Sequence, residues 1–177
     1  VQMLSAMTAL TNDGVRLKPL VVGKVLSPEG AVVARFGPEP AAKTATISAR
    51  VARMVLDMME AATAAGGTQR QAAVEGMRVS VKSGTAQVGL KTGGYAPDRY
   101  VASFLGILPT DDPRLVVYVV LENPRAERPY GGILGGPIFR EAAEELVDYL
   151  GIGRSTDEVY THGPRVAIDP GAPVSIG

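Results

Sequence analysis

Alternation of apolar and polar residues along the chain predicts strands at five places. Two β-rich runs flank Ser27–Gly30, where proline and glycine occupy turn positions, and this arrangement predicts a hairpin. Three further runs, at 77–88, 100–108 and 115–121, follow one another with short connections. Because short connections join antiparallel strands, the sequence predicts an antiparallel meander.

The opening segment has apolar residues at helical spacing. It places Met3, Met7 and Leu10 on one face and is followed by Gly14, where a helix favours a left-handed stop. We therefore expect a buried helix at the start of the chain.

A second helix is expected to begin after Ser48, a candidate N-cap residue, and to end at Gly66 and Gly67. Several of its apolar positions are methionines, which are most simply interpreted as core-filling side chains. The apolar positions are Val51, Met54, Val55, Met58 and Met59.

A third helix is expected within 135–152, with Pro137 in its first turn and Gly151 as its terminator. Its apolar stripe consists of Phe139, Ala142, Ala143, Leu146 and Leu150. An amphipathic helix of this kind is expected to lie on a sheet.

These elements together predict an α/β (α+β) fold, in which an antiparallel sheet is flanked by helices. The periodic pattern covers residues 1–152, which we interpret as one domain. Residues 153–177 lose periodicity and gain proline and glycine, which is typical of a tail or linker.

Composition narrows the possible functions. Eighteen basic and eighteen acidic side chains cancel to a formal net charge of zero, which leaves no electrostatic footprint for nucleic acid. The chain has no cysteine and a single histidine, His162, so thiolate and histidine-cluster metal sites are excluded. No apolar run reaches the ~20 residues that span a bilayer. The chain starts without an initiator methionine or a signal peptide's basic region, so we expect a segment of a longer protein.

Several polar groups are more simply explained by structure than by chemistry. The glycine-rich stretch 128–137 lacks the spacing of a phosphate-binding or dinucleotide turn and is interpreted as a loop before the last helix. His162 has no hydroxyl or carboxylate partner nearby in sequence, which gives little support for a general base. The clustered carboxylates fall on a turn and on an exposed helix face, so they are interpreted as solvated. They are Asp111, Asp112, Glu141, Glu144 and Glu145.

Four consecutive residues in the strand at 77–88 are the strongest candidate for chemistry. Lys82 offers a fixed positive charge, Ser83 and Thr85 offer hydroxyl donors, and Gly84 removes a side chain that would keep a ligand from the strand. Such an edge can bind an extended peptide and hold its terminal carboxylate. The residues alone equally allow a strand with a lysine on its wet face and a glycine bulge.

The stretch "VKSGTAQ" resembles the Lys-Ser/Thr-Gly signature of the penicillin-binding transpeptidases. The segments before it, "VQMLSAMTALTNDGVRLKP" and "GGTQRQAAVEGMRVS", are similar to the class B enzymes of that family. The segments after it, 100–124 and 130–152, resemble the following strands and closing helix. "YVASF" with "DDP" is typical of division enzymes, and the elongation and spore-specific enzymes of the family remain open as alternatives. The resemblance covers residues 1 to about 152 and implies part of a β-lactamase/D,D-peptidase-like transpeptidase fold.

This resemblance implies an acyl transfer between peptidoglycan stem peptides that end in D-alanyl-D-alanine, and inhibition by β-lactams. By resemblance, Lys82 supports proton movement and substrate charge, the hydroxyls of Ser83 and Thr85 hold a carboxylate beside Gly84, and the backbone N–H of Thr85 is an oxyanion donor. It implies no metal or organic cofactor. Cell-division proteins are the implied partners, at the extracytoplasmic face of a membrane, with anchoring by an N-terminal helix outside this segment.

Two other signatures of that family, Ser-x-x-Lys and Ser-x-Asn, are absent from the chain. The first holds the family's nucleophilic serine, so we expect these 177 residues to be inactive alone. The alternatives are a D,D-carboxypeptidase or serine β-lactamase that hands its acyl group to water, and a non-catalytic penicillin-sensing module.

Overall fold

The computed structural model describes residues 1–37 and 45–154. His162 and nearly all of the expected tail therefore lie outside the described residues. In the described part, no helix has both the length and the hydropathy that crossing a membrane requires.

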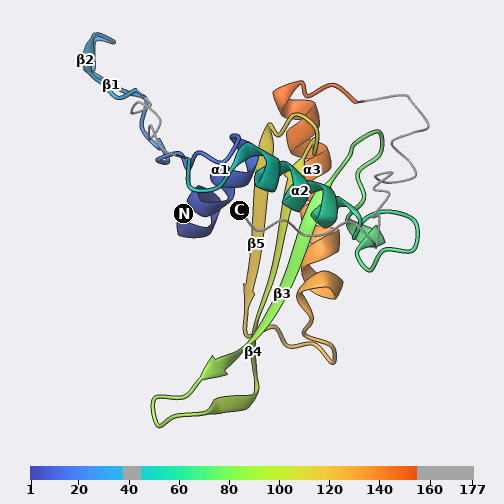
Figure 1. Ribbon diagram of the computed structural model, residues 1–177. Coiled ribbons are helices and arrows are strands. Elements are labelled where there is room, and N and C mark those ends of the chain that lie inside the picture. The colour runs from blue at the N-terminus through green and yellow to red at the C-terminus, as the bar shows by residue number, and fades with distance from the viewer. Residues whose placement is uncertain (38–44, 155–177) are drawn as a thin grey trace.

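A three-stranded antiparallel sheet forms the centre of the molecule (Figure 1). Its strands are β3 (Ser80–Gly89), β4 (Tyr95–Leu108) and β5 (Leu115–Glu122), in the spatial order β3-β4-β5. The expected meander is confirmed. The strand β4 is longer than its sequence pattern suggested, because residues 95–99 extend the hairpin with β3 past a register shift between Gln87 and Gly89.

The expected hairpin is also confirmed, as a separate two-stranded sheet of β1 (Lys24–Leu26) and β2 (Val32–Arg35). Hydrogen bonds within Ser27–Ala31 close its turn, in which Gly30 has a φ of +86°. The hairpin projects away from the main sheet (Figure 1).

Helices cover both faces of the main sheet, so the mixed fold with flanking helices is confirmed (Figure 1). On one face lie α1 (Gln2–Thr11) and α2 (Ala49–Glu60), and on the other lies α3 (Gly131–Leu150). A short 3-10 helix, η1 (Arg70–Ala72), precedes β3 and contacts α3.

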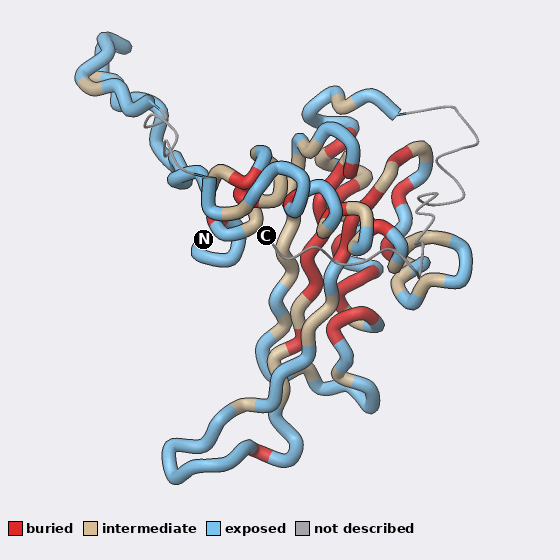
Figure 2. Tube along the Cα trace, viewed as in Figure 1, coloured by how far each residue is buried: buried red, intermediate tan, exposed pale blue. Residues whose placement is uncertain are grey.

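Side chains of β4 alternate between two hydrophobic cores, as the two-residue period of a strand requires. Phe104 and Leu108 pack beneath α3, where the Phe104 ring lies 5.4 Å from that of Phe139. Leu105 and Ile107 pack on the opposite face against α2. Figure 2 shows these buried segments along the centre of the sheet.

The expected buried faces of α1 and α2 were partly wrong. Met3 is 46% exposed, whereas Met7 and Leu10 are partly buried against the core, and the fully buried positions of α1 are Ser5 and Ala9. In α2, Met54 and Met58 are exposed and do not fill the core of the described structure, whereas Met59 packs against the core as expected. The buried positions of α2 are Ala52, Leu56 and Glu60, which lie four residues apart on a neighbouring stripe.

The helix α2 begins as expected, since the Ser48 hydroxyl accepts a hydrogen bond from the N–H of Val51. It ends at Glu60, before the expected stop at Gly66 and Gly67, because the chain turns there toward η1. The glycines instead lie in the turns that connect the two helices.

The helix α3 begins at Gly131, six residues before Pro137, so the expected loop is wrong for 131–137 and holds only for 128–130. Its glycines fit a helix here because Gly131, Gly132, Gly135 and Gly136 are buried against neighbouring groups. Of the expected stripe, Phe139 and Ala143 are buried, whereas Leu150 is 52% exposed. Gly151 ends the helix with a φ of +64°, as expected.

Candidate functional site

The residues Lys82, Ser83, Gly84 and Thr85 lie in the middle of β3, at one edge of the main sheet. One long side of β3 pairs with β4, where Gly84 lies opposite Ser103. Within residues 1–37 and 45–154, no strand pairs with the other side of β3. The four residues therefore stand on a strand with one side open to a ligand.

The alternation of β3 divides the four side chains between its two faces. Val81 belongs to the core beneath α3, so Ser83 and Thr85 lie on the face of α3. Ser80 contacts α2, so Lys82 and Gly84 lie on the face of α2. The side chain of Lys82 is exposed, and its Nζ donates to the carbonyl oxygen of Ser83.

Both hydroxyls of the motif accept hydrogen bonds from neighbouring groups. The Thr85 Oγ1 accepts from the backbone N–H of Gly131, the first residue of α3, at 3.0 Å. The Ser83 Oγ accepts from the side-chain amide of Gln69 at 3.5 Å, a long hydrogen bond. Sequence reasoning missed both donors.

Gly131 lets the start of α3 rest directly on the strands. A Cβ atom there would lie 2.2 Å from the carbonyl oxygen of Ser103 and 2.3 Å from that of Gly84. No side chain fits in this space, so a residue other than glycine would push α3 away from β3. The glycine-rich stretch that looked like a loop in sequence therefore sets the position of a hydrogen-bond donor beside Thr85.

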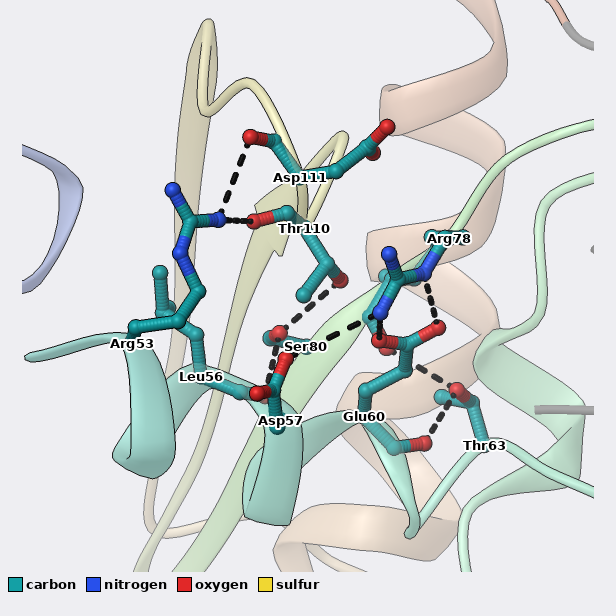
Figure 3. A network of polar contacts seen from close by, with 10 residues as sticks. Arg53, Leu56, Asp57, Glu60, Thr63, Arg78, Ser80, Thr110 and Asp111 are labelled. Carbon is teal, nitrogen blue, oxygen red and sulfur yellow. Dashed lines mark hydrogen bonds and ion pairs between the residues drawn. The ribbon is translucent and has the colours of Figure 1, made fainter. Parts of the chain in front are cut away.

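A polar network fixes the start of β3 to α2 (Figure 3). The Ser80 Oγ donates to the carbonyl oxygen of Leu56 at 2.7 Å and lies 2.9 Å from the Thr110 Oγ1. The Arg53 guanidinium donates to the carbonyl oxygens of Thr110 and Asp111, at 3.0 and 3.1 Å. The strand is thus held two residues before Lys82.

An ion pair reinforces this connection (Figure 3). The Arg78 guanidinium donates to both oxygens of the Glu60 carboxylate, at 2.7 and 2.6 Å, and Glu60 is only 3% exposed. An oxygen of the Asp57 carboxylate lies 3.7 Å from a guanidinium nitrogen of Arg78. The hydrogen bonds to Glu60 raise the pKa of Arg78 above its ordinary value, so the guanidinium stays charged.

The other polar groups that the sequence singled out lie away from the motif. Asp111 and Asp112 are exposed on the turn after β4, and Glu141 and Glu145 are exposed on α3. Glu144 accepts a hydrogen bond from Arg140 one helical turn earlier. Their interpretation as solvated carboxylates is confirmed. Among the described residues, no group of three or more acidic or histidine side chains could hold a metal ion.

A family model described as the penicillin binding protein transpeptidase domain matches residues 1–144. This match covers most of the chain, so the chain belongs to the penicillin-binding transpeptidase family. The family resemblance carried by "VKSGTAQ" and its neighbouring segments is confirmed.

Curated relatives match along most of this chain. The probable peptidoglycan D,D-transpeptidase PenA of Neisseria flavescens is 34% identical over 152 residues, which are 86% of this chain and 34% of that protein. Stage V sporulation protein D of Bacillus subtilis is also 34% identical over 152 residues, 86% of this chain and 23% of that protein. The chain therefore spans about a third or less of the length of these relatives.

Solved structures of penicillin-binding proteins also match most of this chain. Penicillin-binding protein 3 of Mycobacterium tuberculosis, in complex with ampicillin, superposes with a TM-score of 0.75 and 29% identity, covering 91% of this chain and 37% of that one. The transpeptidase domain of Burkholderia pseudomallei penicillin-binding protein 3 gives a TM-score of 0.68 and 30% identity, covering 88% of this chain and 44% of that one.

Proposed function

We propose that this chain supplies the substrate-holding strand of a peptidoglycan D,D-transpeptidase that takes part in septal cell-wall synthesis. The observation that carries this proposal is the position of the Lys-Ser-Gly-Thr motif on an edge strand whose outer side is open among the described residues. A peptide that ends in D-alanyl-D-alanine would lie along this edge as an added strand.

In the proposed reaction, a serine from outside this segment attacks the carbonyl carbon of the penultimate D-alanine. The peptide bond to the terminal D-alanine breaks and that residue leaves, after which an amine of a neighbouring stem peptide takes the acyl group. The serine lies outside because the chain has neither Ser-x-x-Lys nor Ser-x-Asn. A β-lactam would trap the same serine as a stable acyl-enzyme.

The residues of β3 have distinct roles in this proposal. Lys82 is the exposed cation on one face of the strand and would support proton movement and substrate charge. The hydroxyls of Ser83 and Thr85 would hold the terminal carboxylate, and the backbone N–H of Thr85 would stabilise the oxyanion. Gly84 would keep the strand free of a side chain where the peptide approaches.

The cellular setting proposed for the whole protein follows from this reaction. Cross-linking takes place outside the cytoplasmic membrane, so the domain would lie at the extracytoplasmic face, with a membrane anchor elsewhere in the protein. Division proteins would be its partners, and the similarity to a sporulation protein keeps spore-wall synthesis as the competing role.

The test is acylation of the full-length protein by a labelled penicillin. Replacing Thr85 by valine removes a hydrogen bond to a charged group, which is worth ~1.5–3 kcal/mol, so acylation should slow roughly 10- to 150-fold. Thr85→Ser keeps the hydroxyl and should retain most of the rate. Unchanged labelling of Thr85→Val would refute the role of this hydroxyl.

A further inference from the structure

The hydroxyls of Thr85 and Ser83 each accept a hydrogen bond from a neighbouring N–H group, which the proposed function does not explain. A hydroxyl group has one proton to donate and two lone pairs that accept. At Thr85 the neighbouring group is the N–H of Gly131, which can only donate, at 3.0 Å. The Thr85 proton therefore has no acceptor in Gly131 and is free to point elsewhere.

Ser83 also faces a group that donates to its hydroxyl, the Nε2 of Gln69. Hydrogen bonds through Gln71 to Gly132 fix the orientation of this amide. The carbonyl oxygen of Gly132 can only accept, so Gln71 must present its Nε2 to that oxygen, at 2.8 Å. The same Nε2 donates to the Oε1 of Gln69 at 3.2 Å. Because the Oε1 of Gln69 is turned toward Gln71, the Nε2 on the other side of the same amide faces the Ser83 Oγ.

The backbone of α3 therefore sets the polarity of both hydroxyls. Gly131 acts directly on Thr85, and Gly132 acts on Ser83 through Gln71 and Gln69. Gln69 is packed against the helix, since a Cβ atom on Gly132 would lie 2.4 Å from its Oε1. The amide is thus confined by its neighbours as well as hydrogen-bonded.

We propose that Gln69 is a positioning residue for the anionic end of the ligand. Together with the N–H of Gly131, it donates to one lone pair of each hydroxyl from the inner side, so that the protons of Ser83 and Thr85 are directed away from these donors and are available to a carboxylate. The inference deepens the proposed function and rests on it. Two hydroxyl donors on one face of β3, with the ammonium of Lys82 at the carbonyl oxygen of Ser83, match a carboxylate better than a neutral acceptor.

Two substitutions of Gln69 separate this role from packing. In Gln69→Glu, the new carboxylate accepts the Ser83 proton and adds a negative charge beside the ligand's own carboxylate. Gln69→Met keeps a similar length but has no donor, so the Ser83 hydroxyl loses the group that orients it. The control Ala73→Glu adds the same charge at an exposed position of the same segment.

The experiment measures the acylation rate constants of the full-length protein with benzylpenicillin and with its methyl ester, which lacks the negative charge. We expect Gln69→Glu to slow the reaction with the acid about tenfold and with the ester less than about twofold. Gln69→Met should lower the acid-to-ester ratio about threefold, and Ala73→Glu should leave it unchanged. Thermal unfolding of each variant verifies that it is folded.

The outcomes distinguish this inference from the proposed function. An acid-to-ester ratio that stays at the wild-type value in both Gln69 variants would overturn the inference. If both rates fell by the same factor, the result would show a packing role for Gln69. If Gln69→Glu does not fold, the ratio in Gln69→Met decides alone. A full-length wild-type protein that reacts with neither compound would instead overturn the proposed function, and with it this inference.

Discussion

Single residues at the start of β3 hold the motif in place through hydrogen bonds that are out of contact with water. Ser80 is fully buried, and its one hydroxyl contacts both the Leu56 carbonyl of α2 and the Thr110 hydroxyl after β4. A buried polar group without a hydrogen-bond partner destabilises the fold. Because the Ser80 hydroxyl is a partner for the Leu56 carbonyl and for Thr110, it stabilises the junction of α2, β3 and the turn after β4.

The contribution of this hydroxyl can be measured by Ser80→Ala. The substitution leaves the Leu56 carbonyl and the Thr110 hydroxyl without this partner, and we expect it to lower the free energy of unfolding by ~1–3 kcal/mol. Urea unfolding of the 177-residue chain, followed by circular dichroism, measures the change. Ser27→Ala removes a hydroxyl from the exposed hairpin turn and should cost less than about 0.5 kcal/mol. Equal effects of the two substitutions would contradict the argument.

At the scale of elements, the end of α2 is joined to the start of β3 by an ion pair with unequal exposure. The Glu60 carboxylate is buried, whereas the side chain of Arg78 is 26% exposed. Because the Arg78 side chain is partly exposed, the desolvation cost of the pair is lower than that of a fully buried one. The pair can therefore stabilise the junction.

Removing the charge of Glu60 tests this junction. Glu60→Gln leaves Arg78 without its main partner, and we expect a loss of ~1–3 kcal/mol in the free energy of unfolding, less than for a fully buried pair. The matched control is Glu144→Gln, which breaks the exposed pair with Arg140 and should cost less than ~1 kcal/mol. Urea unfolding of both variants gives the comparison, and a loss for Glu144→Gln as large as that for Glu60→Gln would refute it.

The buried face of α2 gives a further prediction. Leu56 is 1% exposed and Met58 is 59% exposed. We expect Leu56→Ala to cost ~2–5 kcal/mol and Met58→Ala less than about 0.5 kcal/mol in the same unfolding measurement. A larger loss for Met58→Ala would mean that the methionine stripe, as first expected from the sequence, is the buried one.

This difference shows where sequence reasoning works at the element scale. The two-residue period of β3, β4 and β5 identifies strands and their faces directly, so the meander was predictable. In α2, two stripes are apolar enough to be buried, and only packing against the sheet selects Leu56 over Met58. The start of α3 was missed because its glycines, which resemble a loop in sequence, are required by close contact with β3 and β4.

At the scale of the whole molecule, the candidate site was predictable as a motif but not as an arrangement. "VKSGTAQ" indicates the four residues of β3 and their family, because the family signature has those residue types in that order. Gln69 stands 13 positions before Lys82 in no recognisable pattern, and its contact with Ser83 depends on how η1 and α3 pack. Such contacts between distant segments leave little trace in one sequence.

The absence of two family signatures gives a prediction for the molecule as a whole. After treatment with a β-lactam, the 177-residue chain should show no covalent adduct by mass spectrometry, since no Ser-x-x-Lys is present. The full-length protein should gain the mass of one β-lactam under the same conditions. An adduct on the 177-residue chain would mean that one of its own serines is the nucleophile.

The hairpin between β3 and β4 extends beyond the sheet and offers a place for an optical reporter (Figure 1). Its tip at Lys91–Gly94 is exposed, and added Cβ atoms on Gly93 and Gly94 would meet nothing within 4 Å. Because the chain has no cysteine, Lys91→Cys would introduce its only thiol, to which a single dye could be attached. The dye would lie on the order of 20 Å along the strand from Thr85, so it would mark the end of β3 without touching the motif.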